Sequence, residues 1–169
     1  MGTSVVIVGG GHAGGQAAAA LRSEGFNGRI MMVADEAHVP YQRPPLSKGF
    51  LSGALGIERV YLKPEKFYLQ QHIELLLNRH AEAINREKRK ITLNDGQVLD
   101  YDNVLLATGS GVRRLQVPGV DLPGVYYLRT IGDSEAIRAH LKPGASIVVV
   151  GGGYIGLEVA SVAATQGLR

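Results

Sequence analysis

Two copies of one glycine-rich pattern constrain this chain more than any other feature. SVVIVGGGHAGG near one end and SIVVVGGGYIGLE near the other each place four β-branched residues directly before the spacing G-x-G-x-x-G. In this pattern the first glycine makes the tight turn out of a strand, the second lets backbone approach a pyrophosphate, and the third packs a helix closely on the sheet. Each copy therefore predicts a strand, a phosphate-binding loop and a helix.

The two copies are a repeat of one structural unit. The three loop glycines recur 142 positions later, so that Gly9, Gly11 and Gly14 correspond to Gly151, Gly153 and Gly156. In both copies a further glycine, Gly25 or Gly167, follows the third loop glycine by 11 positions and predicts the end of the helix. Two copies so far apart cannot stack as an array, so we interpret them as two dinucleotide sites and not as a solenoid.

The first part of the chain predicts an α/β fold with a parallel sheet and a small antiparallel meander. The uninterrupted apolar strand from Ser4 to Val8 is typical of a central parallel strand covered on both faces. A helix to about Glu24 and the strand in GRIMMVADE complete a βαβ unit. FYLQQHIELLL predicts a short helix and a strand near 73–77. The meander follows, with a hairpin at Asp95-Gly96 and a last strand over 103–107.

The second part predicts the start of another Rossmann-like domain. The proline- and glycine-rich stretch QVPGVDLPGVYYLRT is a crossover, and we divide the chain there into domains 1–114 and 115–169. IGDSEAIRAHLKPG predicts a helix, and a strand over 147–150 leads into the second glycine loop.

Composition excludes several classes of protein. The 45% hydrophobic and 20% charged residues are typical of a soluble globular chain, and no apolar run approaches the roughly 18 residues of a membrane span. No secretory signal pattern is visible, so we expect a cytoplasmic protein. Zero cysteines exclude a disulfide and a thiolate metal site, and the histidines lack metal-ligand spacing. The basic stretch NREKRK in a chain of net charge +3 is interpreted as a solvated hairpin end and not as a nucleic-acid site.

A dinucleotide site also needs a carboxylate about 20 residues beyond the loop, to accept the ribose hydroxyls. Asp35 lies 21 positions beyond Gly14, at the end of a predicted strand, with Glu36 beside it. We favour Asp35, and an ordinary surface turn is the alternative. In the second copy the equivalent position is 177, beyond Arg169, so we expect this chain to be part of a longer protein.

The segment PYQRPPLSKGFL, the tripeptide ATG and the paired glycine loops together resemble a known family. They are similar to the FAD-dependent, NAD(P)H-linked ferredoxin reductases of bacterial cytochrome P-450 and dioxygenase systems. These enzymes belong to the two-dinucleotide-domain flavoprotein superfamily, with rubredoxin reductases and apoptosis-inducing factor. RPPLSK is fairly specific to this branch, whereas ATG and the loops are shared across the superfamily. The absence of cysteine excludes the disulfide-reductase branch.

The resemblance implies which residues hold two cofactors. Those implied for FAD are Gly9, Gly11, His12, Ala13, Gly14, Asp35, Glu36, Arg43, Lys48, Ala81, Ala107, Thr108 and Gly109. Those implied for NAD(P)H, with NADH favoured, are Gly151, Gly153, Ile155, Gly156 and Glu158. Lys48 is the one residue given a catalytic role, because a lysine near the flavin N5 favours the reduced, anionic ring. No general base and no metal are expected.

Several of these residues also have ordinary structural interpretations. Lys48 is otherwise an exposed helix lysine, and Glu158 an acid that complements the dipole of its helix. His12 is otherwise variable-loop filler, and ATG a strand-ending turn. Gly111 stands where relatives often carry arginine, so no role is transferred to it.

The resemblance implies an oxidoreductase that passes electrons from NAD(P)H through FAD to a ferredoxin-type iron–sulfur protein feeding an oxygenase. The alternatives are a rubredoxin reductase, another cysteine-free NADH-dependent flavoprotein, or a signalling flavoprotein like apoptosis-inducing factor. Neither nucleic acid nor a membrane is an expected partner. Relatives complete the FAD site with a later segment, so we expect the chain alone to hold FAD poorly and not to turn over NADH.

Overall fold

The structure, a computed structural model, describes residues 3–169. The chain forms two compact units. The sheet unit comprises Met1–Gln42 with Tyr61–Gly109, and the helix unit comprises Arg43–Val60 with Ser110–Arg169. Within residues 3–169, no helix has both the length and the apolar character that crossing a membrane requires.

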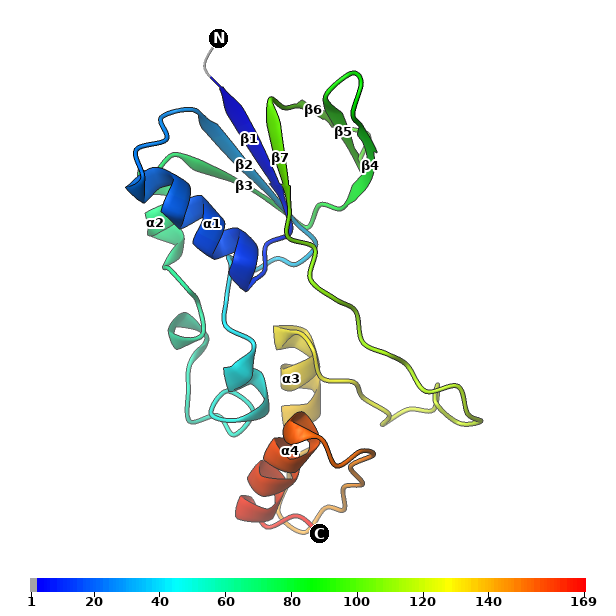
Figure 1. The fold of residues 1–169 in the computed structure, drawn as a ribbon. Helices are drawn as coiled ribbons and strands as arrows, with labels where there is room; N and C mark the ends of the chain where they lie inside the picture. Colours follow the sequence, from blue (N-terminus) through cyan, green and yellow to red (C-terminus); the bar gives the residue numbers. More distant parts are fainter. Residues whose placement is uncertain (1–2) are drawn as a thin grey trace. The chain divides into compact units, whose positions relative to one another are not determined.

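The sheet unit is built on a parallel sheet with the strand order β3-β2-β1-β7 (Figure 1). Its strands are β1 (Ser4–Val8), β2 (Arg29–Ala34), β3 (Ile73–Leu77) and β7 (Asn103–Leu106). The sequence predicted all four segments as strands, but β7 was expected to be the last strand of the meander. It instead pairs in parallel with β1, so the chain leaves the meander before β7.

A set of polar contacts links the start of β7 to the start of β1. Asp102, directly before β7, accepts hydrogen bonds from the backbone N–H of Ser4 at 2.7 Å and from its hydroxyl at 2.9 Å. The backbone N–H of Asp102 donates in return to Ser4 Oγ at 3.1 Å. These three contacts align the starts of β1 and β7. They also hold the pKa of Asp102 below its ordinary value, first through the backbone donor and then through the hydroxyl.

The parallel sheet is covered on both faces, as the uninterrupted apolar strand from Ser4 to Val8 predicted. On one face lie α1 (His12–Ser23) and α2 (Glu65–Gln70) (Figure 1). This core layer contains Val5, Ile7, Ile30 and Met32 of the sheet, with Ala18 of α1 and Tyr68 of α2. The layer on the other face contains Val6, Val8, Met31 and Val33 of the sheet, with Ile91, Leu93 and Leu99 of the meander.

The meander is an antiparallel sheet of β4 (Ala81–Asn85), β5 (Lys90–Leu93) and β6 (Val98–Asp100). The predicted hairpin at Asp95-Gly96 is confirmed, because Gly96 has a φ of +83° and its N–H donates to Leu93 O at 2.9 Å. Lys90, at the end of the basic stretch, pairs with Asp100 at 2.7 Å.

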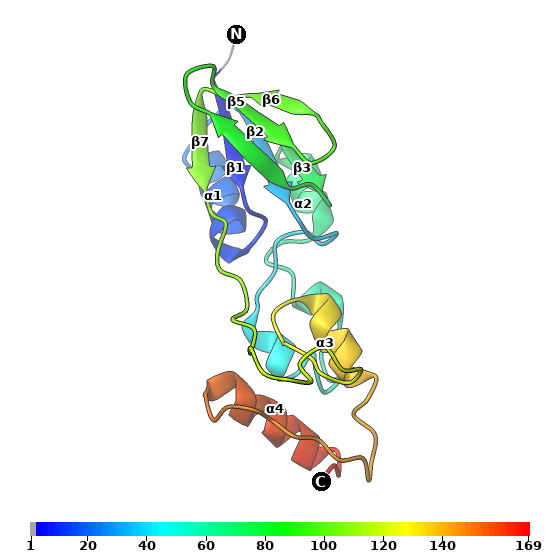
Figure 2. The ribbon, with the colours of Figure 1, turned by 90° about the vertical axis from the view of Figure 1, so that its right-hand side faces the viewer.

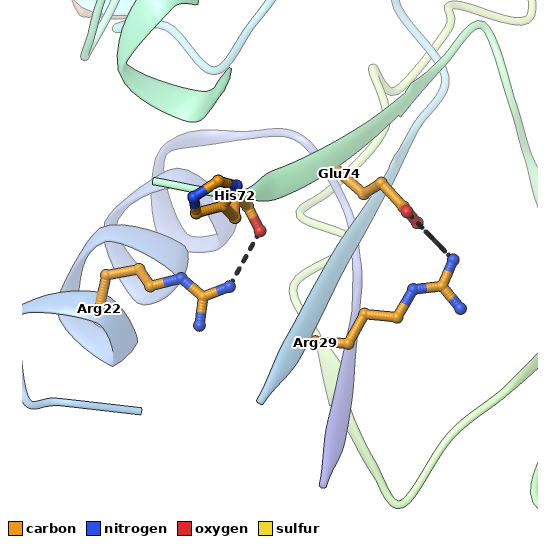
Figure 3. A network of polar contacts seen from close by, with 4 residues as sticks. All are labelled: Arg22, Arg29, His72 and Glu74. Carbon is orange, nitrogen blue, oxygen red and sulfur yellow. Dashed lines mark hydrogen bonds and ion pairs between the residues drawn. The ribbon is translucent and has the colours of Figure 1, made fainter. Parts of the chain in front are cut away.

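Arg22 fastens the end of α1 to its surroundings. Its guanidinium donates to four backbone carbonyls at 2.6–2.9 Å, those of Phe26, Gly28, Gln71 and His72. Figure 3 shows the contact with His72 and, beside it, the ion pair between Arg29 of β2 and Glu74 of β3 at 2.6 Å. Arg22 thereby joins α1, the turn into β2 and the turn into β3.

The helix unit holds the proline motif together with the second glycine loop. It contains the 3₁₀ turns η1 (Pro44–Ser47) and η2 (Ile57–Arg59), followed by α3 (Ile131–Arg138) and α4 (Tyr154–Thr165), which Figure 2 shows in side view. A small core cluster joins Leu51 to Ile137 of α3 and Val159 of α4. Arg43–Val60 thus packs with Ser110–Arg169. The division into domains 1–114 and 115–169 stays a prediction.

The predicted strand at 147–150 was wrong, because this segment has no regular secondary structure. Among residues 3–169 it has no partner strand, and Val148 and Val150 are 86% and 75% exposed. A strand requires hydrogen bonds to a neighbour, which an apolar run alone does not supply. One backbone hydrogen bond nevertheless forms here, from the N–H of Arg169 to Ala145 O at 2.9 Å. It resembles the bond at the start of the β1–β2 pair, from the N–H of Arg29 to Thr3 O at 3.1 Å.

Candidate functional site

The first glycine loop connects β1 to α1 and leaves space at its second glycine. Gly9 has a φ of +122°, and a Cβ built on it would lie 2.2 Å from the carbonyl oxygen of Ala107. A Cβ on Gly14 would lie 2.0 Å from Gly9 O. A Cβ on Gly11 would meet nothing within 4 Å. The first and third glycines are therefore required by the protein's own packing, whereas the second faces open space.

The start of α1 has the properties of a phosphate site. Gly11 is the N-cap residue, no side chain caps the helix, and its first turn carries no acidic residue. The N-terminal N–H groups of a helix carry partial positive charge, which favours an anion at this position. His12 and Ala13 are exposed here.

The carboxylates after β2 have different surroundings. Glu36 accepts a hydrogen bond from the hydroxyl of Tyr41 at 2.6 Å. Asp35 is more exposed, and its Oδ1 lies 2.9 Å from Nδ1 of His80. His80 directly precedes Ala81, the first residue of β4. Sequence reasoning did not identify His80, and its position next to Ala81, a residue implied for FAD, is the one signal that could have indicated it. Asp35 is the more exposed of the two carboxylates, and the preference for it as the ribose acceptor stays a prediction.

The tripeptide ATG lies beside the first glycine loop. The N–H of Ala107 donates to Val8 O at 2.8 Å, so the chain leaving β7 runs next to the end of β1. Thr108 and Gly109 follow, both exposed, and Gly109 has a φ of +68°. The structure thus brings this turn and the loop together, although they lie about one hundred positions apart in the sequence.

The proline motif and α4 contact each other through a polar cluster of Ser47, Lys48 and Glu158. Lys48 Nζ lies 2.7 Å from Oε1 of Glu158, and the hydroxyl of Ser47 donates to Oε2 of Glu158 at 2.5 Å. The hydrogen bond from Lys48, and then that from Ser47, hold the pKa of Glu158 below its ordinary value. Sequence reasoning assigned Lys48 and Glu158 to different cofactors, and it did not identify Ser47. Arg43, which begins the motif, donates to Arg129 O at 2.5 Å.

The second glycine loop repeats the geometry of the first. A Cβ on Gly156 would lie 2.4 Å from Gly151 O, whereas a Cβ on Gly153 would meet nothing within 4 Å. Gly151 has a φ of +110°, and Gly153 is the N-cap of α4 with no capping side chain. Ile155 is 55% exposed beside the loop. This loop therefore has the same capacity for a phosphate.

Within residues 3–169, no three side chains of the metal-ligating kinds His, Cys, Asp and Glu lie close enough to hold an ion. The polar atoms of the site are thus those of the loops, the carboxylates and the lysine.

A family model described as pyridine nucleotide-disulphide oxidoreductase matches residues 3–169. The chain belongs to this family. It contains no cysteine, so it supplies no thiol pair.

Individual relatives are similar over nearly the whole chain. Rhodocoxin reductase of Rhodococcus erythropolis is 45% identical over 98% of this chain and 39% of the relative. A ferredoxin–NAD(P)(+) reductase of a Sphingomonas species is 43% identical over 96% of this chain and 39% of the relative. The reductase in a crystal structure of the covalent putidaredoxin reductase–putidaredoxin complex matches with a TM-score of 0.90 and 42% identity, over 98% of this chain and 40% of that one. The chain thus spans about two fifths of the length of the relatives that it matches.

Proposed function

We propose that the protein carrying this chain is an FAD-dependent NAD(P)H:ferredoxin reductase. In this function hydride passes from the nicotinamide, with NADH favoured, to FAD, and single electrons pass on to a ferredoxin-type iron–sulfur protein that feeds an oxygenase. The observation that carries the proposal is the ion pair between Lys48 and Glu158 at 2.7 Å. Lys48 belongs to the RPPLSK motif, which the resemblance implies contacts the flavin. Glu158 lies two positions beyond Gly156 of the second glycine loop, which is implied to hold the nicotinamide dinucleotide.

The two glycine loops fit two dinucleotides. Each offers an uncapped helix start and a second glycine at which a Cβ would meet no protein atom, as close approach of a pyrophosphate requires. In the proposal, Gly9 to Gly14, Asp35, Glu36 and Arg43 hold FAD, with backbone contributions from Ala81 and from 107–109. Gly151 to Gly156 hold the nicotinamide dinucleotide. When bound, the flavin supplies the acceptance of a hydride and the release of single electrons.

The side chains of the cluster set charge and orientation. The ammonium of Lys48 is half exposed, so it is free to face a ligand on its outer side while Glu158 holds it from the other. Because the pKa of Glu158 is held low, its carboxylate stays ionised at neutral pH and acts as a counter-charge. No proton transfer by a side chain is needed, since the cofactors carry the redox chemistry.

The names of the relatives support the iron–sulfur partner. The Sphingomonas relative is named for ferredoxin and NAD(P)(+), and the solved relative is joined to putidaredoxin. Residence in the cytoplasm is part of the proposal, together with the absence of nucleic-acid and membrane partners.

Rapid-mixing kinetics with the FAD-loaded protein test this function. NADH is expected to bleach the flavin absorbance. A 2Fe–2S ferredoxin is then expected to be reduced faster than an artificial dye. Rubredoxin is tested as the alternative electron acceptor. Lys48→Met should slow flavin reduction, while Lys66→Met, at an exposed lysine of α2, should not. Reduction of the ferredoxin no faster than of the dye would overturn the proposal.

A further inference from the structure

Two buried serines surround the turn that carries Lys48. Among residues 3–169 the buried polar residues are Ser47, 4% exposed, and Ser134, with no exposed surface. Ser134 of α3 donates its hydroxyl to Leu46 O at 2.7 Å and so holds the backbone of η1. Ser47 is the last residue of η1, directly before Lys48. A buried hydroxyl costs free energy unless it is hydrogen-bonded, so the partner of Ser47 is informative.

The partner of Ser47 is the carboxylate of Glu158. A serine hydroxyl has one hydrogen to donate, and two acceptors lie near it. Glu158 Oε2 is at 2.5 Å, whereas Pro44 O is at 3.4 Å, so the carboxylate is the favoured acceptor. The other oxygen, Oε1, faces Lys48 Nζ. Each carboxylate oxygen therefore has its own donor, and rotation of the carboxylate would break both contacts.

We infer that Ser47 is a positioning residue, which fixes the Glu158 carboxylate so that its other oxygen stays against the ammonium of Lys48. The turn that presents Ser47 is itself rigid, because Pro44 and Pro45 open it and Ser134 holds it. The importance of this geometry for catalysis rests on the proposed function, whereas the geometry itself does not.

Other charges near the cluster are engaged elsewhere. Arg43 donates to Arg129 O, Asp133 forms the capping box of α3 with Thr130, and Arg138 donates to Phe50 O. Lys48 forms an ion pair with Glu158 at 2.7 Å. A change in the titration of Glu158 on altering Ser47 therefore reports on the hydrogen bond between them.

The test is a ¹³C NMR titration of the Glu158 carboxyl, assigned with Glu158→Gln. Ser47→Ala is expected to raise the titration midpoint, because a donor to the charged form is lost, and Ser47→Thr is expected to move it back toward that of the unaltered protein. Ser134→Ala is the matched control: it removes a buried hydroxyl of α3 that contacts the same turn but not Glu158, so the midpoint should shift less than in Ser47→Ala. Ser47→Cys, nearly equal in volume but a weak donor, carries the same expectation if the alanine variant does not fold.

Equal midpoints in folded Ser47→Ala and unaltered protein would overturn the inference, as would equal shifts in the Ser47 and Ser134 variants. In the FAD-loaded protein, Ser47→Ala should lower kcat for flavin reduction by NADH with little change in KM. A shifted Glu158 titration with unchanged flavin reduction would support the positioning of Glu158 and count against the role proposed for Lys48. The two proposals therefore fail separately.

Discussion

Alanine substitutions at two glycines of the first loop should separate folding from cofactor binding. At Gly14 the new Cβ would lie 2.0 Å from Gly9 O and 3.3 Å from Cγ2 of Ile7, so α1 would have to move away from β1. At Gly11 the new Cβ would meet nothing within 4 Å, and the φ of −80° suits alanine. A pyrophosphate at this loop would occupy the space beside Gly11.

The magnitudes follow from these surroundings. Overpacking costs about 1–3 kcal/mol, so Gly14→Ala should lower Tm by roughly 2–12 °C in a chain of this size. Alanine in place of glycine at an N-cap costs about 0.5–1 kcal/mol. The reduced freedom of the unfolded chain returns about 0.4–1 kcal/mol, so Gly11→Ala should leave Tm within about 2 °C. Its affinity for FAD should nevertheless fall by roughly tenfold or more, a loss of about 1.4 kcal/mol.

Thermal unfolding and quenching of flavin fluorescence measure the two effects on the same samples. Gly153→Ala is the matched variant in the second loop, where a Cβ also meets nothing within 4 Å. It should weaken binding of NADH and spare FAD. Unchanged FAD affinity in Gly11→Ala would refute the reasoning, because a pyrophosphate would then not approach this glycine.

Three further variants test individual contacts. Arg22→Met, which removes donors from four backbone carbonyls, should lower the free energy of unfolding by about 1.5–3 kcal/mol in urea denaturation, whereas Arg29→Met, in an exposed ion pair, should cost at most about 1 kcal/mol. Asp102→Asn should destabilise at pH 7, and the difference should disappear as pH falls below about 4, because the folded-state pKa of Asp102 is lowered and its stabilisation is lost on protonation. Tyr68→Phe should leave the free energy of unfolding unchanged or raise it, because it removes a buried hydroxyl that has no hydrogen-bond partner among residues 3–169. The same burial raises the pKa of Tyr68 to about 12.

Local pattern was sufficient for much of the fold. The bounds of β1 and β3 agree with those predicted, since runs of mostly β-branched or apolar residues between turn residues specify strands over a few positions. The hairpin at Asp95-Gly96 was likewise predictable, because Asp-Gly readily adopts the positive φ that a tight turn requires. The spacing of the loop glycines also predicted that the second glycine of each loop differs from the other two. Of the six loop glycines, Gly11 and Gly153 are the two that are N-cap residues and at which a Cβ would meet no atom within 4 Å.

The partners of these elements depended on the tertiary structure. The strand β7 was predicted, but its parallel pairing with β1, which lies nearly one hundred positions away, was not. The apolar run at 147–150 was equally strand-like, and without a hydrogen-bonded neighbour among residues 3–169 it is not a strand. Strand pairing is a property of two segments, so the sequence of one segment is insufficient.

The candidate site divides in the same way. Local sequence predicted the chemical groups: two glycine loops with the spacing of phosphate sites, the carboxylate of Asp35 and the lysine of the proline motif. Which of these groups meet became visible in the folded chain, where His80 lies against Asp35 and Glu158 lies between Ser47 and Lys48. A residue's chemical identity and its local backbone preference can be read from its own stretch of sequence. A contact across about 110 positions exists only when helices and turns pack to bring the two side chains within hydrogen-bond distance.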